Sequence, residues 1–246
     1  MTEKTVNHST HRHLYEPPDF HEINQYAYSL IPPRPDEVLR MEEIAREQRF
    51  PIIGAVCGYL CYQYARLINA KRIFELGSGY GYSTYWFARA VRENCGGIVH
   101  HTVFDEELSE AAQKHIEKLG MKDLVKFHLS EAVQALNETG GEYDLLFCDI
   151  DKHGYPDALE AMERHLRPGG LVIFDNMLLG GSVLPSHEEK KPEPTDTPEL
   201  HKWREQLSQN LHGVRQTTEK LFKSSAWIST LIPLRDGMAV GMKVTS

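Results

Sequence analysis

No apolar run in the sequence is long enough to cross a bilayer, and basic residues are not in excess. The longest apolar stretches, such as residues 171–174, fall far short of the roughly 20 residues that a membrane-spanning helix needs. Lysine and arginine total 27 against 35 aspartate and glutamate residues, a formal net charge of -8. A surface of that sign repels phosphate backbones. We therefore expect neither a membrane nor a nucleic acid as a partner.

Cysteine is also scarce. The four cysteines include no Cys-x-x-Cys pair and lie in apolar or glycine-rich settings, which argues against a disulfide framework and against a zinc site. The N-terminus is polar and contains histidine, unlike the charged end and apolar core of a secretory signal. These features predict a cytoplasmic protein with reduced thiols.

The domain organisation follows from length and composition. The chain has 246 residues, 41% of them hydrophobic, which suits one large α/β domain. Residues 1–35 are rich in histidine and proline and predict an N-terminal arm with short helical pieces. Residues 36–246 predict a single domain, in which the charged, proline-rich stretch 186–198 forms a flexible surface loop.

Most of the domain alternates between short apolar runs and helical patterns. Two helices are expected between residues 35 and 69. The strands that follow are expected at residues 72–76, 98–104, 125–129, 144–149 and 171–175. The helices between them are expected at residues 83–93, 106–119, 132–137 and 156–166. Such alternation predicts βαβ units and a parallel sheet with helices on both faces.

The rhythm changes near the C-terminus. A helix is expected at residues 198–210, followed by strands at 228–234 and 238–244. Asp236 and Gly237 form an Asp-Gly turn, which supports the positive φ that a tight hairpin needs. The sequence therefore predicts an α/β fold with a seven-stranded, mostly parallel sheet closed by an antiparallel C-terminal hairpin.

A glycine-rich segment, Glu75–Ser83 (ELGSGYGYS), follows the first predicted strand and opens a helix. Gly77 and Gly79 allow a tight turn and the close approach of a ligand. A dinucleotide fingerprint would need a third glycine where Tyr82 stands. The carboxylate of Glu75 suits a cationic ligand such as S-adenosylmethionine, which carries a sulfonium and an ammonium group. The alternative is a structural turn with Glu75 as its cap.

Two further acidic residues follow predicted strands. In an open parallel sheet the ligand lies beyond the carboxyl ends of the strands. Asp105 follows the second strand and is a candidate to bind ribose hydroxyls, and Glu131 follows the third and is a candidate to bind the adenine amino group. Each has an alternative reading, because Asp105 also fits a helix N-cap and Glu131 fits a first-turn helix charge.

A candidate metal site arises where the fourth and fifth strands end. Asp149 and Asp175 end these strands, which one crossover helix joins, so the strands lie side by side and both carboxylates point into one crevice. The carboxylates repel each other unless a cation or proton lies between them, and Asn176 adds a neutral oxygen. Three oxygen ligands favour a hard divalent ion, Mg2+ first and Mn2+ or Ca2+ as alternatives. Two aspartates that cap separate helices are the other reading.

Lys152 lies three positions after Asp149, in the loop that leaves the same strand. Its side chain can approach a substrate hydroxyl bound to the metal, and the neighbouring cation favours the neutral amine, which can act as the general base in catalysis. The alternative is a solvated loop lysine with no role in chemistry.

Together, these motifs resemble the metal-dependent class I S-adenosylmethionine O-methyltransferases, the family of catechol and caffeoyl-coenzyme A O-methyltransferases. The resemblance covers about residues 50–244. It rests on the segments INAKRIFELGSGYGYS, YDLLFCDIDKHGY, LRPGGLVIFDN and LIPLRDGMAVGMK. It implies a Rossmann-like fold and a metal-assisted O-methylation of a small phenolic, catechol-like substrate.

The resemblance also implies residue roles. Asp149, Asp175 and Asn176 would bind the metal, and Lys152 would be the catalytic base. Together with Asp105, which is a candidate only from its place after the second strand, the residues expected to contact S-adenosylmethionine are Glu75, Gly77, Ser78, Gly79, Tyr82, Ser83, Glu131, Ala132 and Asp149. Members of the family are usually dimers, and the aromatic residues Tyr59, Tyr62 and Tyr64 favour a homodimer here.

The chain departs from the family pattern at two places. Val103 stands where the family usually has its ribose-binding acid, and Leu178 and Leu179 stand near the usual position of a tryptophan. Val103 motivates one alternative, a non-catalytic or metal-independent S-adenosylmethionine-binding protein. A nicotinamide-dependent oxidoreductase is a further alternative, disfavoured by the absent third glycine and by the paired aspartates.

Overall fold

The computed structural model describes residues 20–187, 189 and 191–244. Residues 1–19 of the predicted arm lie outside the described residues, as do positions 188 and 190 of the predicted surface loop and the last two residues. Three helices precede the first strand: α1 (Phe20–Ser29), α2 (Asp36–Gln48) and α3 (Gly54–Leu67). Helix α1 falls within the predicted arm, and α2 and α3 match the two helices expected before the first strand.

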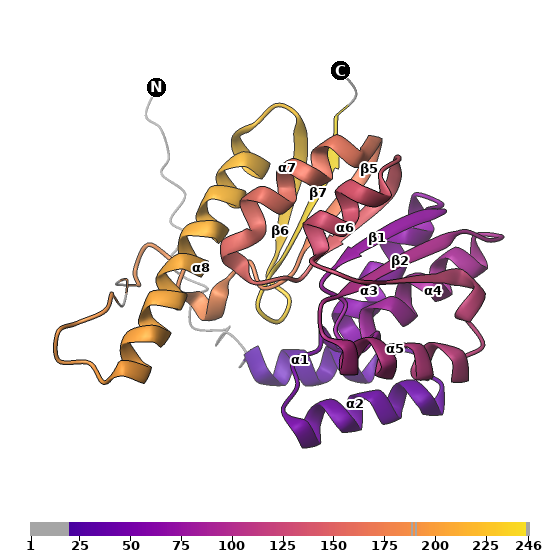
Figure 1. Cartoon of the computed structure of the whole chain (residues 1–246), viewed down its shortest axis with the longest axis horizontal. Helices are drawn as coiled ribbons and strands as arrows, with labels where there is room; N and C mark the ends of the chain where they lie inside the picture. The colour runs from indigo at the N-terminus through magenta and orange to yellow at the C-terminus, as the bar shows by residue number, and fades with distance from the viewer. Residues whose placement is uncertain (1–19, 188, 190, 245–246) are drawn as a thin grey trace, which may run out of the picture.

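Seven strands form one sheet in the order β3-β2-β1-β4-β5-β7-β6 (Figure 1). Their bounds are β1 Arg72–Leu76, β2 Ile98–Val103, β3 Val125–Leu129, β4 Tyr143–Cys148, β5 Leu166–Phe174, β6 Trp227–Ile232 and β7 Met238–Lys243. Strands β1 to β5 pair in parallel, and β7 runs antiparallel between β5 and β6. The predicted seven-stranded sheet with its C-terminal hairpin is confirmed.

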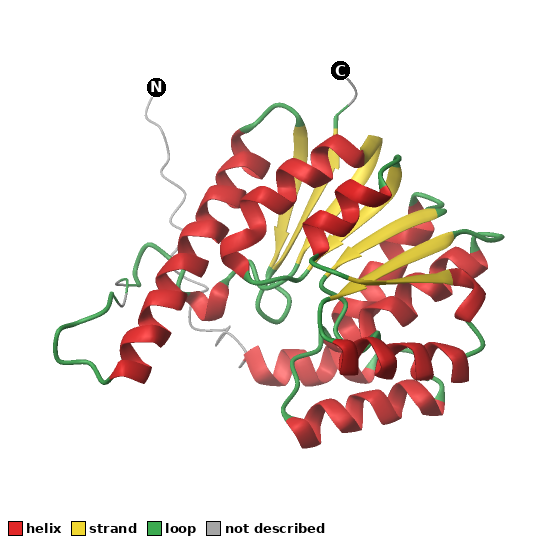
Figure 2. Ribbon diagram, viewed as in Figure 1, coloured by secondary structure: helices red, strands yellow, loops and turns green. Residues whose placement is uncertain are grey.

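Helices cover both faces of this sheet (Figure 2). The remaining helices are α4 Tyr82–Glu93, α5 Glu106–Lys118, α6 Ala132–Thr139, α7 Tyr155–His165 and α8 Pro198–Lys223. Because successive strand residues point to opposite faces, Ile73 packs into the core beneath α3 and α4, while Phe74 packs into the core beneath α6 and α7. The two cores lie on opposite faces of the sheet, and the carboxyl edge of the strands lies between them.

Helix α8 is the largest departure from the sequence prediction, because it continues to Lys223 rather than ending near residue 210. Its second half buries Leu211, Val214 and Leu221, and two of these lie only three residues apart on the face that packs against the sheet and α7. Gly213 lowers the helix propensity of this stretch, but packing outweighs propensity.

Two further features of the fold concern its helices and its cysteines. In the described part of the chain, no helix combines the length and the apolar character needed to span a bilayer. All four cysteines are free; Cys57, Cys61 and Cys148 are buried and Cys95 is exposed. The expectation of reduced thiols stays a prediction.

Candidate functional site

A pocket of about 540 Å³ opens at the carboxyl edge of the sheet. Loops that follow all five parallel strands line it, together with the turn between β6 and β7 and the segment before α3. Most of the residues predicted from the sequence meet here: Gly77, Ser78, Gly79, Tyr82, Ser83, Glu131, Ala132, Asp149, Lys152, Asp175 and Asn176. Glu75 and Asp105 are not part of the lining.

The glycine-rich loop lies close to the end of β4 and to the ring of Phe50. Gly77 has φ +84°, and a Cβ atom there would lie 2.6 Å from the carbonyl oxygen of Asp149. Gly79 has φ +51°, and its Cβ would lie 3.2 Å from the ring of Phe50. The backbone N–H of Ser78 donates to the carbonyl of Thr102 at 2.9 Å. Both glycines are therefore required, one by the approach of β4 and the other by a backbone conformation that disfavours side chains.

Glu75 lies beneath this loop rather than in the pocket. Its side chain is 0% exposed, and neither carboxyl oxygen accepts a hydrogen bond of ordinary geometry from the described residues. Burial raises the pKa of Glu75 to about 7, and the nearby hydroxyls of Ser83 and Thr84 oppose this only in part. A direct contact between Glu75 and the cofactor stays a prediction.

The two other acidic candidates both act as helix caps. Asp105 accepts from the N–H of Leu108 at 2.9 Å and caps α5, and Glu131 accepts from Val133 and from Gln134 and caps α6. Glu131 also lines the pocket, which keeps it available to a ligand. For Asp105 the geometry matches the capping alternative, and its assignment to ribose gains no support.

Asp149 and Asp175 lie side by side, because each directly follows one of the paired residues Cys148 and Phe174. Asp175 is 1% exposed, and both of its carboxyl oxygens are buried without a hydrogen-bond partner among the described residues. Burial first, and then the charge of Asp149, raise the pKa of Asp175 to about 7, and the guanidinium of Arg235 opposes this. The site thus holds two acidic groups that are short of positive charge.

Lys152 partly supplies that charge. Its Nζ donates to Oδ1 of Asp149 at 2.9 Å. Burial raises the pKa of Asp149, and the neighbouring Lys152 lowers it. The short 3-10 turn Lys152–Gly154 is held by α8, where Asn210 accepts from the N–H of His153 at 3.0 Å. A Cβ atom on Gly213 of α8 would collide with the carbonyl oxygen of Lys152. The long helix α8 therefore fixes the turn that carries the proposed base.

The donor set can be tested for its fit to a divalent cation. No group of three His, Cys, Asp or Glu side chains suited to a metal occurs among residues 20–187, 189 and 191–244. The candidate set is different in kind, since it combines two carboxylates with the amide of Asn176. The orphaned oxygens of Asp175 beside Asp149 are what a hard cation would satisfy. The residues present fit such an ion.

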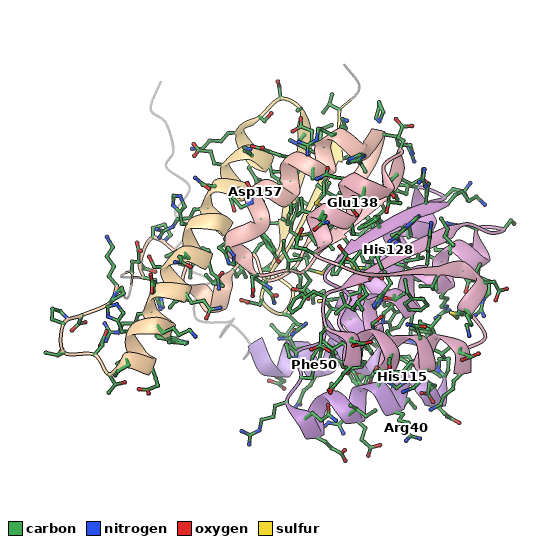
Figure 3. The ribbon with its side chains drawn as sticks, viewed as in Figure 1. Arg40, Phe50, His115, His128, Glu138 and Asp157 are labelled. Atoms are coloured by element: carbon green, nitrogen blue, oxygen red, sulfur yellow. The ribbon has the colours of Figure 1, made fainter. Side chains whose placement is uncertain are left out.

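Sequence reasoning missed several contributors to the pocket, among them one arginine and two phenylalanines. Arg235, in the turn between β6 and β7, places Nη1 3.8 Å from Oδ2 of Asp175. Phe50 begins the segment before α3, and its ring centroid lies 4.9 Å from that of Tyr80 (Figure 3). Phe104, directly after β2, is 82% exposed at the pocket. For Arg235 the topology could have predicted the contact, because a hairpin turn beside β5 reaches the same edge of the sheet as the strand ends.

This fold and pocket define a class I S-adenosylmethionine-dependent methyltransferase: five parallel strands, an antiparallel β7 inserted between β5 and β6, and a glycine-rich turn after β1 that opens onto the carboxyl edge. Within that class, the chain belongs to the O-methyltransferase family, whose sequence model matches residues 53–244. The prediction of an S-adenosylmethionine-dependent O-methyltransferase is confirmed, and the oxidoreductase alternative is set aside.

Individual relatives agree with the family. The catechol O-methyltransferase of Niastella koreensis is 32% identical over 181 residues, which cover 71% of this chain and 80% of that protein. The caffeoyl-CoA O-methyltransferase of Populus kitakamiensis is 30% identical and is matched over 70% of this chain and 77% of that protein. The crystal structure of the O-methyltransferase TomG from Streptomyces achromogenes, in complex with S-adenosylmethionine, has a TM-score of 0.74 and 26% identity, covering 91% of this chain and 96% of that one.

Proposed function

We propose that the protein methylates a hydroxyl group of a small, catechol-like phenol and that a divalent metal ion bound by Asp149, Asp175 and Asn176 assists the reaction. The observation that carries this proposal is the state of Asp175, a carboxyl group 1% exposed with both oxygens unpartnered beside a second carboxylate. Burying such a pair without a cation is costly, so the arrangement favours an ion between the two groups.

The ligand set also suggests which ion. Carboxylate and amide oxygens without imidazole or thiolate favour a hard cation, so Mg2+ is the first choice and Mn2+ and Ca2+ are alternatives. When bound, such an ion supplies Lewis acidity that favours the ionised form of a phenol. The two relatives named for catechol and caffeoyl-CoA support a phenolic acceptor.

In this proposal Lys152 accepts the proton of the acceptor hydroxyl in its neutral amine form, which a divalent cation held by Asp149 would favour. Methyl transfer from a sulfonium to oxygen needs the acceptor oxygen in line with the breaking carbon–sulfur bond, so the residues that hold the acceptor also set the rate. The Lys152 side chain is only 17% exposed and points at Asp149 from a turn fixed by α8. Its nitrogen therefore has a defined position from which to take a proton.

The cofactor would occupy the other half of the pocket. The turn at Gly77–Gly79 would hold the methionine part, and Glu131 with Ala132 would meet the adenine. A volume of about 540 Å³ is in the range of small-molecule sites, roughly 300–1,000 Å³, and suits a cofactor with a small acceptor. Since Val103 offers no carboxylate to the ribose, the hydroxyl of Ser130 beside it is a polar group available for that contact.

Assembly and location complete the proposal. We infer a cytoplasmic homodimer, with α3 at the interface. Tyr59 stacks on Tyr62 at 5.5 Å and packs against Trp86 of the same chain at 5.9 Å, so these rings are only partly available to a second chain. Light scattering at micromolar concentration should give a dimer mass, and a monomer mass would reject the interface.

The function is tested by methylation of catechol in the presence of S-adenosylmethionine and Mg2+. We expect methylated catechol to form. Titration calorimetry should show that the protein binds S-adenosylhomocysteine and does not bind NAD. The Arg235 guanidinium near Asp175 favours one competing function, a metal-independent methyltransferase in which the arginine supplies the positive charge. Activity that survives an excess of chelator would establish that alternative.

A further inference from the structure

Arg235 brings a positive charge into the pocket without a matched partner. Its closest acidic atom, Oδ2 of Asp175, lies 3.8 Å from Nη1, which is beyond hydrogen-bond distance. In the described part of the chain no residue hydrogen-bonds to the guanidinium, and the side chain is 36% exposed at the pocket. A guanidinium has five N–H donors and stays charged at every physiological pH. Most of its donors therefore face the pocket.

The backbone beneath this side chain is fixed. The turn that carries Arg235 is tied to the loop after β5, because Met177 and Leu178 donate to the carbonyls of Gly237 and Asp236 at 2.9 and 2.7 Å. Asp236 also accepts from the N–H of Gly180 at 2.6 Å. Arg235 itself has φ +51°, in the left-handed region that costs a non-glycine residue energy. The fold thus retains an arginine where glycine would be easier.

The charges around the pocket leave the Arg235 guanidinium without a negatively charged partner. Asp149 is paired with Lys152, and among the described residues Asp175 is the one carboxylate within 4 Å of the Arg235 guanidinium. In the proposed function Asp175 and Asn176 hold a cation, so the charge of Asp175 is no longer available to the guanidinium. The stem of Arg235 also passes 3.7 Å from the Cβ position of Gly54, where α3 begins without a side-chain cap. Asp149 is then engaged by Lys152, Asp175 by the cation and Asp236 by the N–H of Gly180, so none of these three carboxylates is left to pair with the guanidinium.

We propose that Arg235 binds a carboxylate on the methyl acceptor, so that the preferred substrate is a catechol-like phenol bearing a carboxylate group. The planar fork of arginine matches a carboxylate in a bidentate pair, which fixes orientation as well as adding affinity. An acceptor held at both ends, by its hydroxyls near Asp175 and by its carboxylate on Arg235, has one orientation in the pocket. This inference rests on the proposed function for the acceptor hydroxyl.

The test compares an acid with its neutral ester. For 3,4-dihydroxybenzoate and its methyl ester, kcat/KM is measured with the wild type, Arg235→Gly, Arg235→Lys and the control Arg40→Ala, an exposed arginine on α2 (Figure 3). Glycine at position 235 suits φ +51° and keeps the turn. We expect the wild type to prefer the acid, and Arg235→Gly to lower the acid-to-ester ratio by roughly 10²-fold, the scale of losing a charged partner. Arg235→Lys should retain part of the preference, and Arg40→Ala all of it.

Binding separates this inference from the proposed function. Titration calorimetry of the acid and of the ester is performed on full-length protein saturated with S-adenosylhomocysteine and Mg2+. Tighter binding of the acid that disappears in Arg235→Gly supports the inference even if neither compound is methylated, an outcome that would count against the proposed function alone. Equal binding of acid and ester by the wild type, or an equal loss of both in Arg235→Gly, overturns it.

Discussion

Nζ of Lys152 lies 2.9 Å from Oδ1 of Asp149, so the proposed base is ion-paired with a proposed metal ligand. The two roles are coupled through this carboxylate. A cation bound by Asp149 weakens the hold of the carboxylate on Lys152, and Lys152 in turn competes with the cation for the same oxygen. Removing the lysine should therefore affect proton transfer and metal binding in opposite directions.

Lys152→Ala is expected to lower kcat by roughly 10²–10⁴-fold, the usual contribution of a general base. The loss should shrink as pH rises, because the phenol then ionises unaided. Affinity for Mg2+, measured by calorimetry, should be retained or increased, since Asp149 loses its competing partner. Lys126→Ala, which removes an exposed lysine on β3, is the control. Full activity of Lys152→Ala would remove the lysine from the mechanism.

Gly213→Ala tests how α8 positions the base. On propensity alone, alanine should stabilise a helix interior by about 1 kcal/mol relative to glycine. A Cβ at this position would instead collide with the carbonyl of Lys152 and approach Cα of His153 at 2.8 Å. We expect a lower Tm together with a lower kcat. Gln209→Ala, at an exposed position on the same helix, should change neither. A more stable, fully active Gly213→Ala would show that the close approach is unimportant.

Gly79→Val tests the glycine-rich loop. The left-handed φ of +51° strains any side chain, and the added atoms would enter space between the loop and Phe50. Calorimetry should show no binding of S-adenosylmethionine. Gly96→Val is a matched control, since Gly96 has φ +99° but nothing within 4 Å of its Cβ position. Both variants should lose stability through the backbone, and only Gly79→Val should lose the cofactor. Normal binding by Gly79→Val would refute the loop assignment.

The sheet and most of the pocket could be predicted because they depend on short-range pattern. Short apolar runs between helical patterns predicted the strands, and the rule that ligands lie beyond the strand ends predicted that Asp149, Asp175 and Glu131 share one edge. The second half of α8 was not predicted, since what holds it is long-range packing, including the contact of Gly213 with a turn 60 positions earlier in the chain. Arg235 was missed for a similar reason, because only the pairing of β7 with β5 brings its turn to Asp175.

The histidines of β2 and β3 predict a pH dependence of stability. Nδ1 of His100 lies 2.9 Å from Nε2 of His128, and burial, then the charge of His128, lower the pKa of His100 to about 4. The unfolded value is near 6.5, so between the two values only the unfolded chain is protonated at this site. Stability is therefore lost as pH falls from about 6.5 to about 4.

His100→Phe keeps a ring against Phe74 and removes this titration. Over the same window, its free energy of unfolding in urea should fall by roughly 1–3 kcal/mol less than that of the wild type. Glu75 is present in both proteins, so its contribution to the pH dependence cancels in the comparison. Its raised pKa would make stability increase as pH falls, which is opposite to the effect of His100. The control is His201→Phe, at an exposed position on α8, which should follow the wild type. Parallel curves for His100→Phe and the wild type would contradict the assignment.

Asp175→Ala separates the metal hypothesis from its alternatives, because it should change stability and activity in opposite directions. Without metal, the variant lacks a buried, unpartnered acid beside Asp149, so its Tm should rise. Added Mg2+ should raise the Tm of the wild type by binding the native state and leave that of Asp175→Ala unchanged. Methylation should fall by several orders of magnitude in the variant, since one carboxylate and one amide are too few ligands for a hard cation. Chelator should abolish wild-type activity, added Mg2+ or Mn2+ should restore it, and binding of S-adenosylmethionine should survive both treatments. Wild-type activity in excess chelator, together with no effect of Mg2+ on Tm, would exclude the metal and leave Lys152 and Arg235 as the positive charges at the acceptor.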